Sequence, residues 1–259
     1  MPSELSTQRH GATLVLTLSD PATRNALSPQ ACAAGVETLS VAESSEDIRC
    51  VVLRGDGAHF CSGGNLQRLA HNRSMGAEEQ RQSIERFHAL IEALRTFPKP
   101  VIAAVEGYAA GGGFSLALAC DLLVAAEDAK FVMSYANAGL SPDGGGSWHL
   151  AQQLPRARVL QALWLAEPVS AGELQQFGLA NVVAPSGQAL AEALRLAEQL
   201  ASMAPNALAS AKELVNNAPQ RRLREHLDAE REHFVANLLD ANGAEGLQAF
   251  FDKRPPRFR

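Results

Sequence analysis

The sequence predicts an α/β fold, in which short apolar strands alternate with helices around a largely parallel sheet. Apolar runs of strand length occur at residues 50–54 and 101–105, and a glycine-rich turn follows each of them. Between the two runs, apolar residues spaced three and four apart mark one face of a helix over residues 84–94. Strands that alternate with helices in this way are joined by right-handed crossovers and pair in parallel.

The other elements follow from local signals. Residues 13–19 alternate and are β-branched, which predicts a strand. Ser28 can cap a helix whose first position is Pro29. Further strands are expected at residues 122–125, 130–133 and 181–184, and further helices at residues 114–120, 145–153, 157–166 and 171–177.

The chain beyond Gly187 is expected to be helical throughout. Spacings of four and seven residues keep one apolar face through Leu223, Leu227, Phe234 and Leu238. We therefore expect an α/β core over residues 1–186 and a C-terminal helical region over residues 187–259. A helical region with such a face needs a surface to pack on.

Composition and charge are typical of a globular protein with a reduced interior. The 259 residues are 46% hydrophobic and 20% charged, and a net charge of −5 argues against a nucleic-acid partner. Cys32, Cys50, Cys61 and Cys120 lie in or beside apolar runs and lack metal-ligand spacing, so we expect free core thiols and no metal site. No apolar run approaches the roughly 20 residues that span a bilayer, and the N-terminus is polar. We expect a cytoplasmic protein without a membrane partner.

Two glycine turns predict a site for an oxygen that becomes negative. Gly111, Gly112 and Gly113 separate the strand at 101–105 from an apolar helical run. The first N–H groups of a helix have no partner within it and lie at the positive end of its dipole. A second turn around Gly64 follows the strand at 50–54, so two N–H donors from two strand ends could hold one carbonyl oxygen. The turns lack the Lys-Ser/Thr pair of a phosphate loop, which favours the oxyanion.

Three segments together resemble the enoyl-CoA hydratase/isomerase (crotonase) family. They are FCSGGNL at residues 60–66, AAGGGFSLALACD at 109–121 and GLSPDGGGSW at 139–148, and the similarity extends over about residues 14–258. The resemblance implies a ββα superhelix with a C-terminal helical trimerisation region, in a homotrimer or a dimer of trimers. It also implies an acyl-CoA substrate whose thioester oxygen binds the amides of Gly64 and Gly112. Coenzyme A is then part of the substrate, and no separate cofactor is expected.

The resemblance also assigns binding residues. The P-x-x-x-N-A-L turn at residues 21–27 would line the CoA pocket, and residues near CoA adenine and phosphates would come from a neighbouring subunit. Arg24 is otherwise a solvated turn residue, and the two phenylalanines are otherwise core residues. Residues 66–81 match a mobile flap over the acyl chain, so we expect little order there. The assigned residues are Arg24, Ala26, Ser62, Asn65, Leu66, Phe234, Phe250 and Lys253.

The catalytic acid and base of the family's hydratases are missing. The two positions that carry glutamates in those enzymes are Ser115 and Tyr135 here. A serine hydroxyl, or a tyrosine with a pKa of roughly 10, is a poor base at neutral pH. Both side chains are expected to line the acyl pocket, and Tyr135 either orients the substrate or Asp143 or simply packs.

Asp143 is the candidate proton shuttle. Its segment resembles the isomerases of the phenylacetate pathway and related 1,3-enoyl-CoA isomerases, which use an aspartate at this position. One carboxylate suffices for a 1,3-proton shift. The alternative is that Asp143 caps the following helix. Close by, we expect Trp148 to pack and His149 to be exposed.

Three functions remain open at this point. The first is an isomerase acting through Asp143 on an unsaturated fatty acyl-CoA or on a ring-epoxide CoA of phenylacetate breakdown. The second is a hydratase or hydrolase of the same family, which would use Asp143 with water. The third is a CoA-thioester binding module without catalytic activity.

Overall fold

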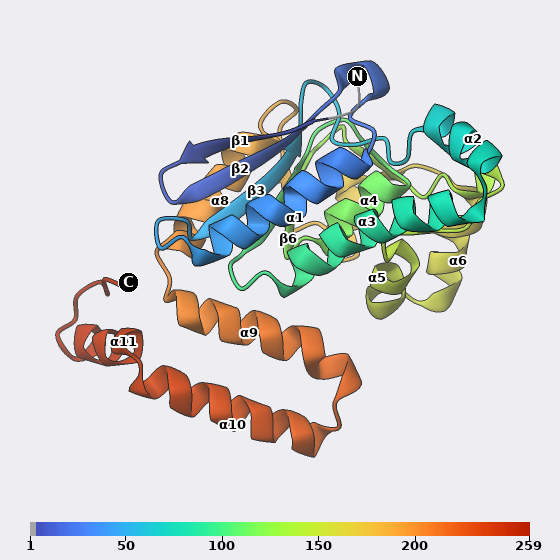
Figure 1. The fold of residues 1–259 in the computed structure, drawn as a ribbon. Coiled ribbons are helices and arrows are strands. Elements are labelled where there is room, and N and C mark those ends of the chain that lie inside the picture. The colour runs from blue at the N-terminus through green and yellow to red at the C-terminus, as the bar shows by residue number, and fades with distance from the viewer. Residues whose placement is uncertain (1–3) are drawn as a thin grey trace.

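The computed structural model describes residues 4–259, in which a six-stranded sheet carries the core (Figure 1). The strand order is β1–β2–β3–β4–β6–β9, and only the β1–β2 pair is antiparallel. The expected parallel sheet is thus confirmed. The strands are β1 (Glu4–His10), β2 (Thr13–Ser19), β3 (Cys50–Gly55), β4 (Val101–Val105), β6 (Leu122–Ala126) and β9 (Val182–Ala184).

A second sheet of three short strands lies next to the glycine turns. It has the order β5–β7–β8, with β5 (Tyr108–Ala110) parallel to β7 (Lys130–Val132) and β8 (Val169–Ser170) antiparallel to β7. Cys61 forms an isolated parallel bridge to Ala109 of β5. This bridge joins the loop after β3 to the segment that leads into the glycine run.

Helices surround the main sheet and extend beyond it (Figure 1). Helix α1 begins at the expected proline, and the Ser28 hydroxyl accepts a hydrogen bond from the Ala31 amide at 3.0 Å. The helices are α1 (Pro29–Ser44), α2 (Leu66–Met75), α3 (Ala77–Thr96), α4 (Gly112–Ala119), α5 (Gly146–Gln153), α6 (Arg156–Leu165), α7 (Ala171–Gln176), α8 (Ala189–Ala201), α9 (Pro205–Asn217), α10 (Leu223–Leu239) and α11 (Ala241–Phe251).

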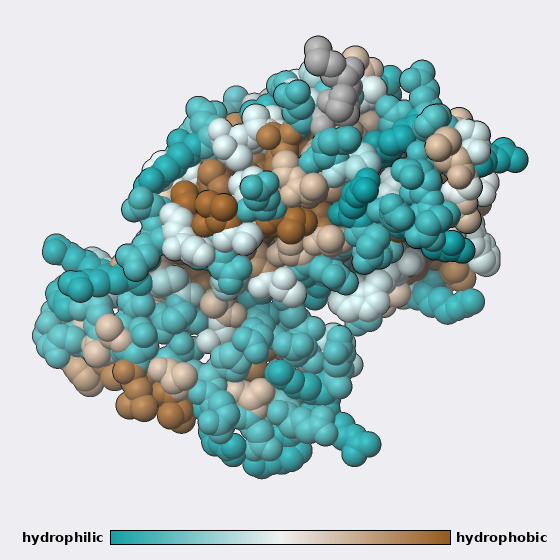
Figure 2. Space-filling model, viewed as in Figure 1, coloured by the Kyte–Doolittle hydropathy of each residue, from teal (hydrophilic) through white to brown (hydrophobic). Residues whose placement is uncertain are grey.

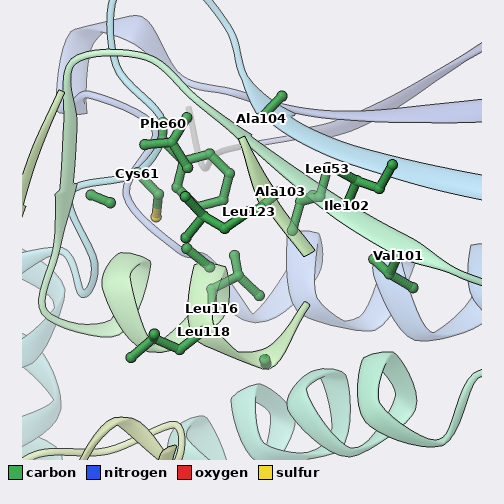
Figure 3. Close-up of a cluster of buried hydrophobic side chains, with 14 of the residues drawn as sticks. Leu53, Phe60, Cys61, Val101, Ile102, Ala103, Ala104, Leu116, Leu118 and Leu123 are labelled. Carbon is green, nitrogen blue, oxygen red and sulfur yellow. The ribbon is translucent and has the colours of Figure 1, made fainter. Parts of the chain in front are cut away.

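The core lies between the sheet and α4 (Figure 3). Ile102 of β4 and Leu116 of α4 are fully buried, and so is Phe60 at the end of the β3 loop. All eight residues of α4 are buried, which is why its sequence is apolar on every side. The helix that follows the glycine run is therefore fixed on all sides by packing.

Helix α8 belongs to this core as well. Ala189, Ala193 and Ala197 form its buried face and pack with the sheet. The Glu106 carboxylate, at the end of β4, accepts hydrogen bonds from the amides of Gly187 and Ala189 at 3.0 and 2.8 Å. The helical region expected from residue 187 thus includes one helix that packs on the sheet, while α9, α10 and α11 project from it as an arm (Figure 1).

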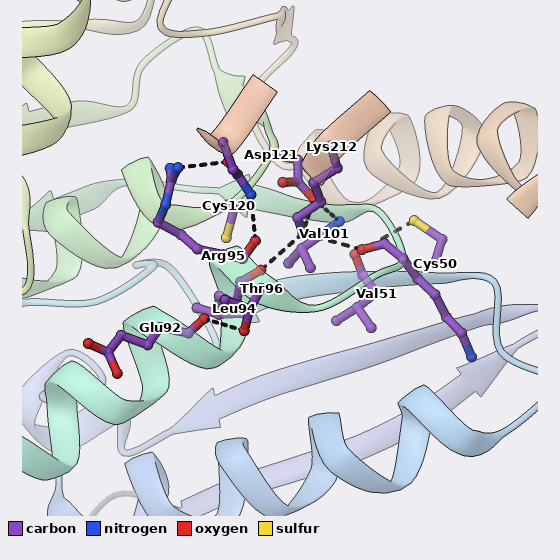
Figure 4. A network of polar contacts seen from close by, with 12 residues as sticks. Cys50, Val51, Glu92, Leu94, Arg95, Thr96, Val101, Cys120, Asp121 and Lys212 are labelled. Carbon is purple, nitrogen blue, oxygen red and sulfur yellow. Dashed lines mark hydrogen bonds and ion pairs between the residues drawn. The ribbon is translucent and has the colours of Figure 1, made fainter. Parts of the chain in front are cut away.

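A polar network joins this arm to the core (Figure 4). The Lys212 ammonium on α9 donates to the carbonyl oxygens of Leu94 and Lys99 at 3.0 and 3.5 Å. It also contacts Asp121 Oδ2 at 2.8 Å, and the same oxygen accepts the Val101 amide at 2.8 Å. Burial raises the pKa of Asp121, and Lys212 opposes that effect.

The segment expected to show little order is helical. Residues 66–81 form α2 and the first turns of α3. The Asn65 side chain caps α2 by accepting the Arg68 amide at 3.1 Å, and the Asn72 amide donates to Gln80 Oε1 at 2.8 Å. Polar contacts hold this part of the two helices together.

The exposed surface of the arm carries large apolar side chains. Leu223, Phe234 and Phe250 are 74%, 69% and 78% exposed, and Figure 2 shows apolar side chains on the surface of this part of the chain. Within residues 4–259, no helix is both long enough and apolar enough to cross a membrane.

Candidate active site

The two glycine turns lie directly against each other. A β-carbon at Gly113 would stand 2.2 Å from the Cys61 carbonyl oxygen, and one at Gly63 would stand 2.6 Å from the Ala110 carbonyl oxygen. Such distances exclude any side chain, and Gly63 also has a positive φ of 85°. These glycines therefore permit a close approach of two backbones that no other residue allows.

The amides of Gly64 and Gly112 are free donors in this contact region. Gly112 is the first residue of α4, and Gly64 lies between β3 and α2. Neither N–H donates a hydrogen bond to any of residues 4–259. Leu27 contacts both turns. It forms an isolated parallel β-bridge with Gly64, and its Cδ1 lies 3.4 Å from the β-carbon position of Gly112. The expected pair of backbone donors is thus brought together.

The turn at residues 21–27 is fastened to the Gly64 turn by its backbone. The Ser62 amide donates to the Arg24 carbonyl at 3.0 Å, and the Leu27 amide donates to the Gly63 carbonyl at 2.8 Å. The buried Asn25 amide donates to the carbonyl oxygens of Asp56 and His59 at 2.9 and 2.7 Å. The turn therefore fixes the position of the first candidate donor.

Asp143 lies beside the second candidate donor. Its Oδ1 is 3.5 Å from the β-carbon position of Gly112. The Tyr135 hydroxyl donates to the same Oδ1 at 2.6 Å, and the Ser115 hydroxyl donates to the Asp143 carbonyl oxygen at 2.9 Å. A β-carbon at Gly144 would stand 2.3 Å from the Phe87 ring, so the glycine run lets this segment lie close to α3 and α4.

The alternative that Asp143 is a helix cap is wrong. Helix α5 begins at Gly146, and its N-cap residue, Gly145, makes no side-chain cap bond. The alternative that Tyr135 merely packs is also wrong, because its hydroxyl bonds the carboxylate. Burial and the neighbouring Asp143 charge raise the pKa of Tyr135 above its usual 10. Tyr135 therefore stays protonated and acts as a donor.

The other candidate binding residues fall into two groups. Five of them lie near the glycine turns. The Ser62 hydroxyl donates to the Thr23 carbonyl at 2.7 Å, and the Asn65 side chain caps α2. Ala26 is buried, whereas Arg24 and Leu66 are exposed. Phe234, Phe250 and Lys253 lie on the arm, away from α2 and α4 (Figure 1), so one chain does not bring them to the glycines. The interpretation of the two phenylalanines as core residues of this chain is wrong, because both are exposed.

The prediction for His149 is wrong, since its side chain is only 3% exposed. Helix α5 packs on α4, and this contact turns His149 inward. Burial, together with the charge of Arg95, lowers the pKa of His149 to about 4, so the ring is neutral at pH 7. Trp148 is partly exposed, and the Arg95 guanidinium lies 4.8 Å from its ring centroid.

The sequence does not mark Phe87 as a site residue, although its ring contacts the site. Its ring lies 3.3 Å from the β-carbon position of Gly112. In the sequence it stands on the apolar face of the helix, where it has the same signal as any core residue. Together the side chains and amides form a site that can hold a carbonyl oxygen on two donors and move a proton beside it.

Comparisons with known proteins identify the family and the fold. A sequence model of the enoyl-CoA hydratase/isomerase family matches residues 8–259. The 1,2-epoxyphenylacetyl-CoA isomerase of Escherichia coli (strain K12) is 36% identical over 246 residues, which is 95% of this chain and 94% of the relative. The 2,3-dehydroadipyl-CoA hydratase of the same strain is 34% identical over 257 residues, 99% of each chain. A crystal structure of an enoyl-CoA hydratase from Polaromonas sp. JS666 matches with a TM-score of 0.98 and 57% identity, over 99% of this chain and 100% of that one.

The chain therefore belongs to the enoyl-CoA hydratase/isomerase family. It is an acyl-CoA enzyme with the fold of that family, and its C-terminal helices are present. The fold expected from the resemblance is confirmed. The relatives are named as both isomerases and hydratases, so the family alone does not select one reaction.

Proposed function

We propose that the protein is an acyl-CoA isomerase that moves a proton between two carbons of an unsaturated or ring-epoxide acyl group. The observation that carries this proposal is the Asp143 carboxylate, which Tyr135 holds next to Gly112. The two positions at which the hydratases of the family carry glutamates hold Ser115 and Tyr135. One carboxylate is enough for a proton shift, whereas hydration by the family's usual route needs two.

The proposed reaction begins with the thioester oxygen on the amides of Gly64 and Gly112. When a proton leaves the α-carbon of a 3-enoyl thioester, its electron pair moves into the conjugated system and negative charge gathers on that oxygen. Donors already aimed at this position stabilise the enolate without rearranging. Helix α4 adds to this effect because the Gly112 amide lies at its positive end.

The proton passes through one oxygen of Asp143. Tyr135 occupies Oδ1, while Oδ2 forms no hydrogen bond within the described residues 4–259. Oδ2 therefore takes the α-proton and returns it to the γ-carbon, and the double bond moves between the two events. The aspartate ends ionised as it began, so the step is balanced and needs no further reactant.

The main alternative is a hydratase in which Asp143 activates water. Its support is the 34% identical relative that is named a hydratase and the 57% identical crystal structure that is named an enoyl-CoA hydratase. The 36% identical relative, whose printed name is an isomerase of an epoxide thioester, supports the isomerase. The two positions at which the family's hydratases carry glutamates both lack a carboxylate here, and this observation favours isomerisation.

We also propose that three copies assemble through the arm. The exposed leucines and phenylalanines of the arm form an apolar surface of the kind that subunit interfaces bury. Phe234, Phe250 and Lys253 also lie far from the glycines of their own chain. In such an assembly these residues would serve the CoA adenine and phosphates of a neighbouring site, as the resemblance implies.

Replacing Asp143 by Asn tests the reaction. Asp143→Asn keeps the size of the side chain and removes the base, so we expect it to bind acyl-CoA yet lose conversion of 3-enoyl-CoA to 2-enoyl-CoA by several orders of magnitude. A natural control is Asp128→Asn, which changes an exposed aspartate in the turn between β6 and β7. If Asp143→Asn isomerises as fast as the wild type, the proposal fails. If the wild type hydrates crotonyl-CoA rapidly and isomerises nothing, the hydratase replaces it.

A further inference from the structure

Arg68 is a partly buried arginine without a partner. Its Nε is shielded from solvent and makes no hydrogen bond, and its guanidinium forms no hydrogen bond or ion pair within residues 4–259. By contrast, the similarly buried Arg95 donates to Asn216 Oδ1 at 2.7 Å. An arginine stays charged, and a shielded N–H donor of that charged group is costly unless something pairs with it.

Arg68 precedes a residue that contacts the glycine site. It stands in the first turn of α2, and the next residue, Leu69, reaches to within 3.6 Å of the β-carbon position of Gly64. The Cys32 thiol on α1 lies within electrostatic reach of both Arg68 and Asp143. The charges of Arg68 and of the proposed proton shuttle therefore both act on this thiol.

The inner face of α2 is polar beyond Arg68. Asn72 follows Arg68 by one turn and is 4% exposed, and its amide donates to Gln80 Oε1 of α3. Gln80 pairs with Asn72, whereas a helix that covers a purely hydrocarbon acyl chain needs no unpaired arginine. Burying these groups beside an alkyl tail would leave the guanidinium unpaired.

We propose that Arg68 selects an acyl group that carries a carboxylate, so that the substrate is a CoA thioester of a dicarboxylic acid. This inference rests on the proposed function of the glycine site as the thioester-binding site. The guanidinium presents a planar fork of N–H donors that matches the two oxygens of a carboxylate. A neutral ring oxygen would accept fewer of these bonds and would leave the charge unbalanced. The carboxylate of Asp143 does not fill this role, because Tyr135 holds it at Gly112.

Equilibrium binding of saturated thioesters tests this inference. Saturated acyl-CoA thioesters have no double bond to move, so their dissociation constants do not depend on which reaction the enzyme catalyses. The probes are pairs with four to eight acyl carbons, each pair consisting of the simple thioester and its ω-carboxylate counterpart, measured by titration calorimetry. We expect the wild type to bind the best-fitting carboxylate member about 10- to 100-fold more tightly than its neutral counterpart.

Three variants separate a specific role from a general one. Arg68→Met keeps an unbranched apolar stem and should reduce the preference to less than about threefold, while Arg68→Lys should keep part of it. Arg73→Met, on the exposed side of the same helix, should leave the preference unchanged. Circular dichroism and the midpoint of thermal unfolding establish that each variant folds.

Two outcomes overturn the inference. If the wild type binds both members of every pair equally, Arg68 does not read a carboxylate. If Arg68→Met weakens free CoA, the neutral thioester and the carboxylate thioester by the same factor, then Arg68 contacts the phosphates of CoA. The proposed function is tested separately, because the Asp143→Asn experiment measures isomerisation and these experiments measure only binding.

Discussion

Removing the Tyr135 hydroxyl should slow the reaction without weakening substrate binding. In Tyr135→Phe, Asp143 Oδ1 loses a hydrogen bond of 2.6 Å, and the Ser115 hydroxyl cannot replace it because it is engaged by the Asp143 carbonyl oxygen. A hydrogen bond to a charged group contributes about 1.5–3 kcal/mol. Tenfold in rate corresponds to about 1.4 kcal/mol, so kcat should fall by about 10- to 100-fold, with KM changed by less than about threefold.

A double-mutant cycle shows whether the effect passes through Asp143. In the Asp143→Asn background, Tyr135→Phe should cost less than about threefold, because the charged acceptor is already gone. The residual rates can be followed by solvent deuterium exchange into the acyl chain. The control is Tyr108→Phe, since Tyr108 is the other tyrosine of the chain and its partly exposed hydroxyl makes no hydrogen bond in residues 4–259. A full loss in both backgrounds, or no loss in either, refutes the role of Tyr135 as a positioning residue.

Three further predictions concern the oxyanion donor, a buried histidine and the assembly. Gly112→Pro removes one N–H donor at the first position of a helix, where proline is tolerated. Turnover should therefore fall by about 10²–10³-fold. Near-normal turnover by a folded variant would contradict the role of this amide. Burial keeps His149 neutral in the folded state, so below pH 6.5 only the unfolded state binds a proton at this residue. Between pH 7 and pH 5, the free energy of unfolding of the wild type should therefore fall by about 2 kcal/mol more than that of His149→Gln. Urea titrations that show equal losses for the two proteins would refute this prediction. Light scattering at micromolar concentration should show a trimer or hexamer for the wild type and smaller species after truncation before Phe234, and a wild type that is only monomeric would refute the proposed assembly.

Elements with a buried apolar face were predictable from the sequence. The strands Thr13–Ser19 and Val101–Val105 have the expected bounds, and α1 begins at the expected Pro29. These segments either alternate in polarity, are apolar throughout, or begin with a capping serine. Each signal reflects packing or a cap that is local in sequence.

Elements held by polar or distant contacts were not predictable. Strand β1 (Glu4–His10) is exposed along almost its whole length and exists because it pairs with β2 at the edge of the sheet. Helix α2 has a polar inner face, so no apolar period marks it. The three residues of β5 form a strand only because β7 lies beside them.

The site was predictable as a set of positions but not as a set of contacts. The resemblance gave Gly64, Gly112 and Asp143, and the structure brings the three segments together. The bond from Tyr135 to Asp143 joins residues on two loops whose relative position only the fold defines. The burial of His149 likewise depends on how α5 packs against α4, which the sequence of α5 alone does not contain.

Helix α4 connects the attachment point of α9 to the proposed thioester site. Its eight residues span about 12 Å, with Gly112 at one end and Asp121 just beyond the other. Asp121 is the residue that Lys212 binds from α9, so the arm is attached just beyond the end of the helix that presents the proposed oxyanion donor. All residues of α4 are buried, so this helix cannot bend independently of the residues packed around it. Substitutions in α9 that are made to alter assembly therefore act about one helix length from the chemistry, and their effect on turnover must be measured together with their effect on subunit association.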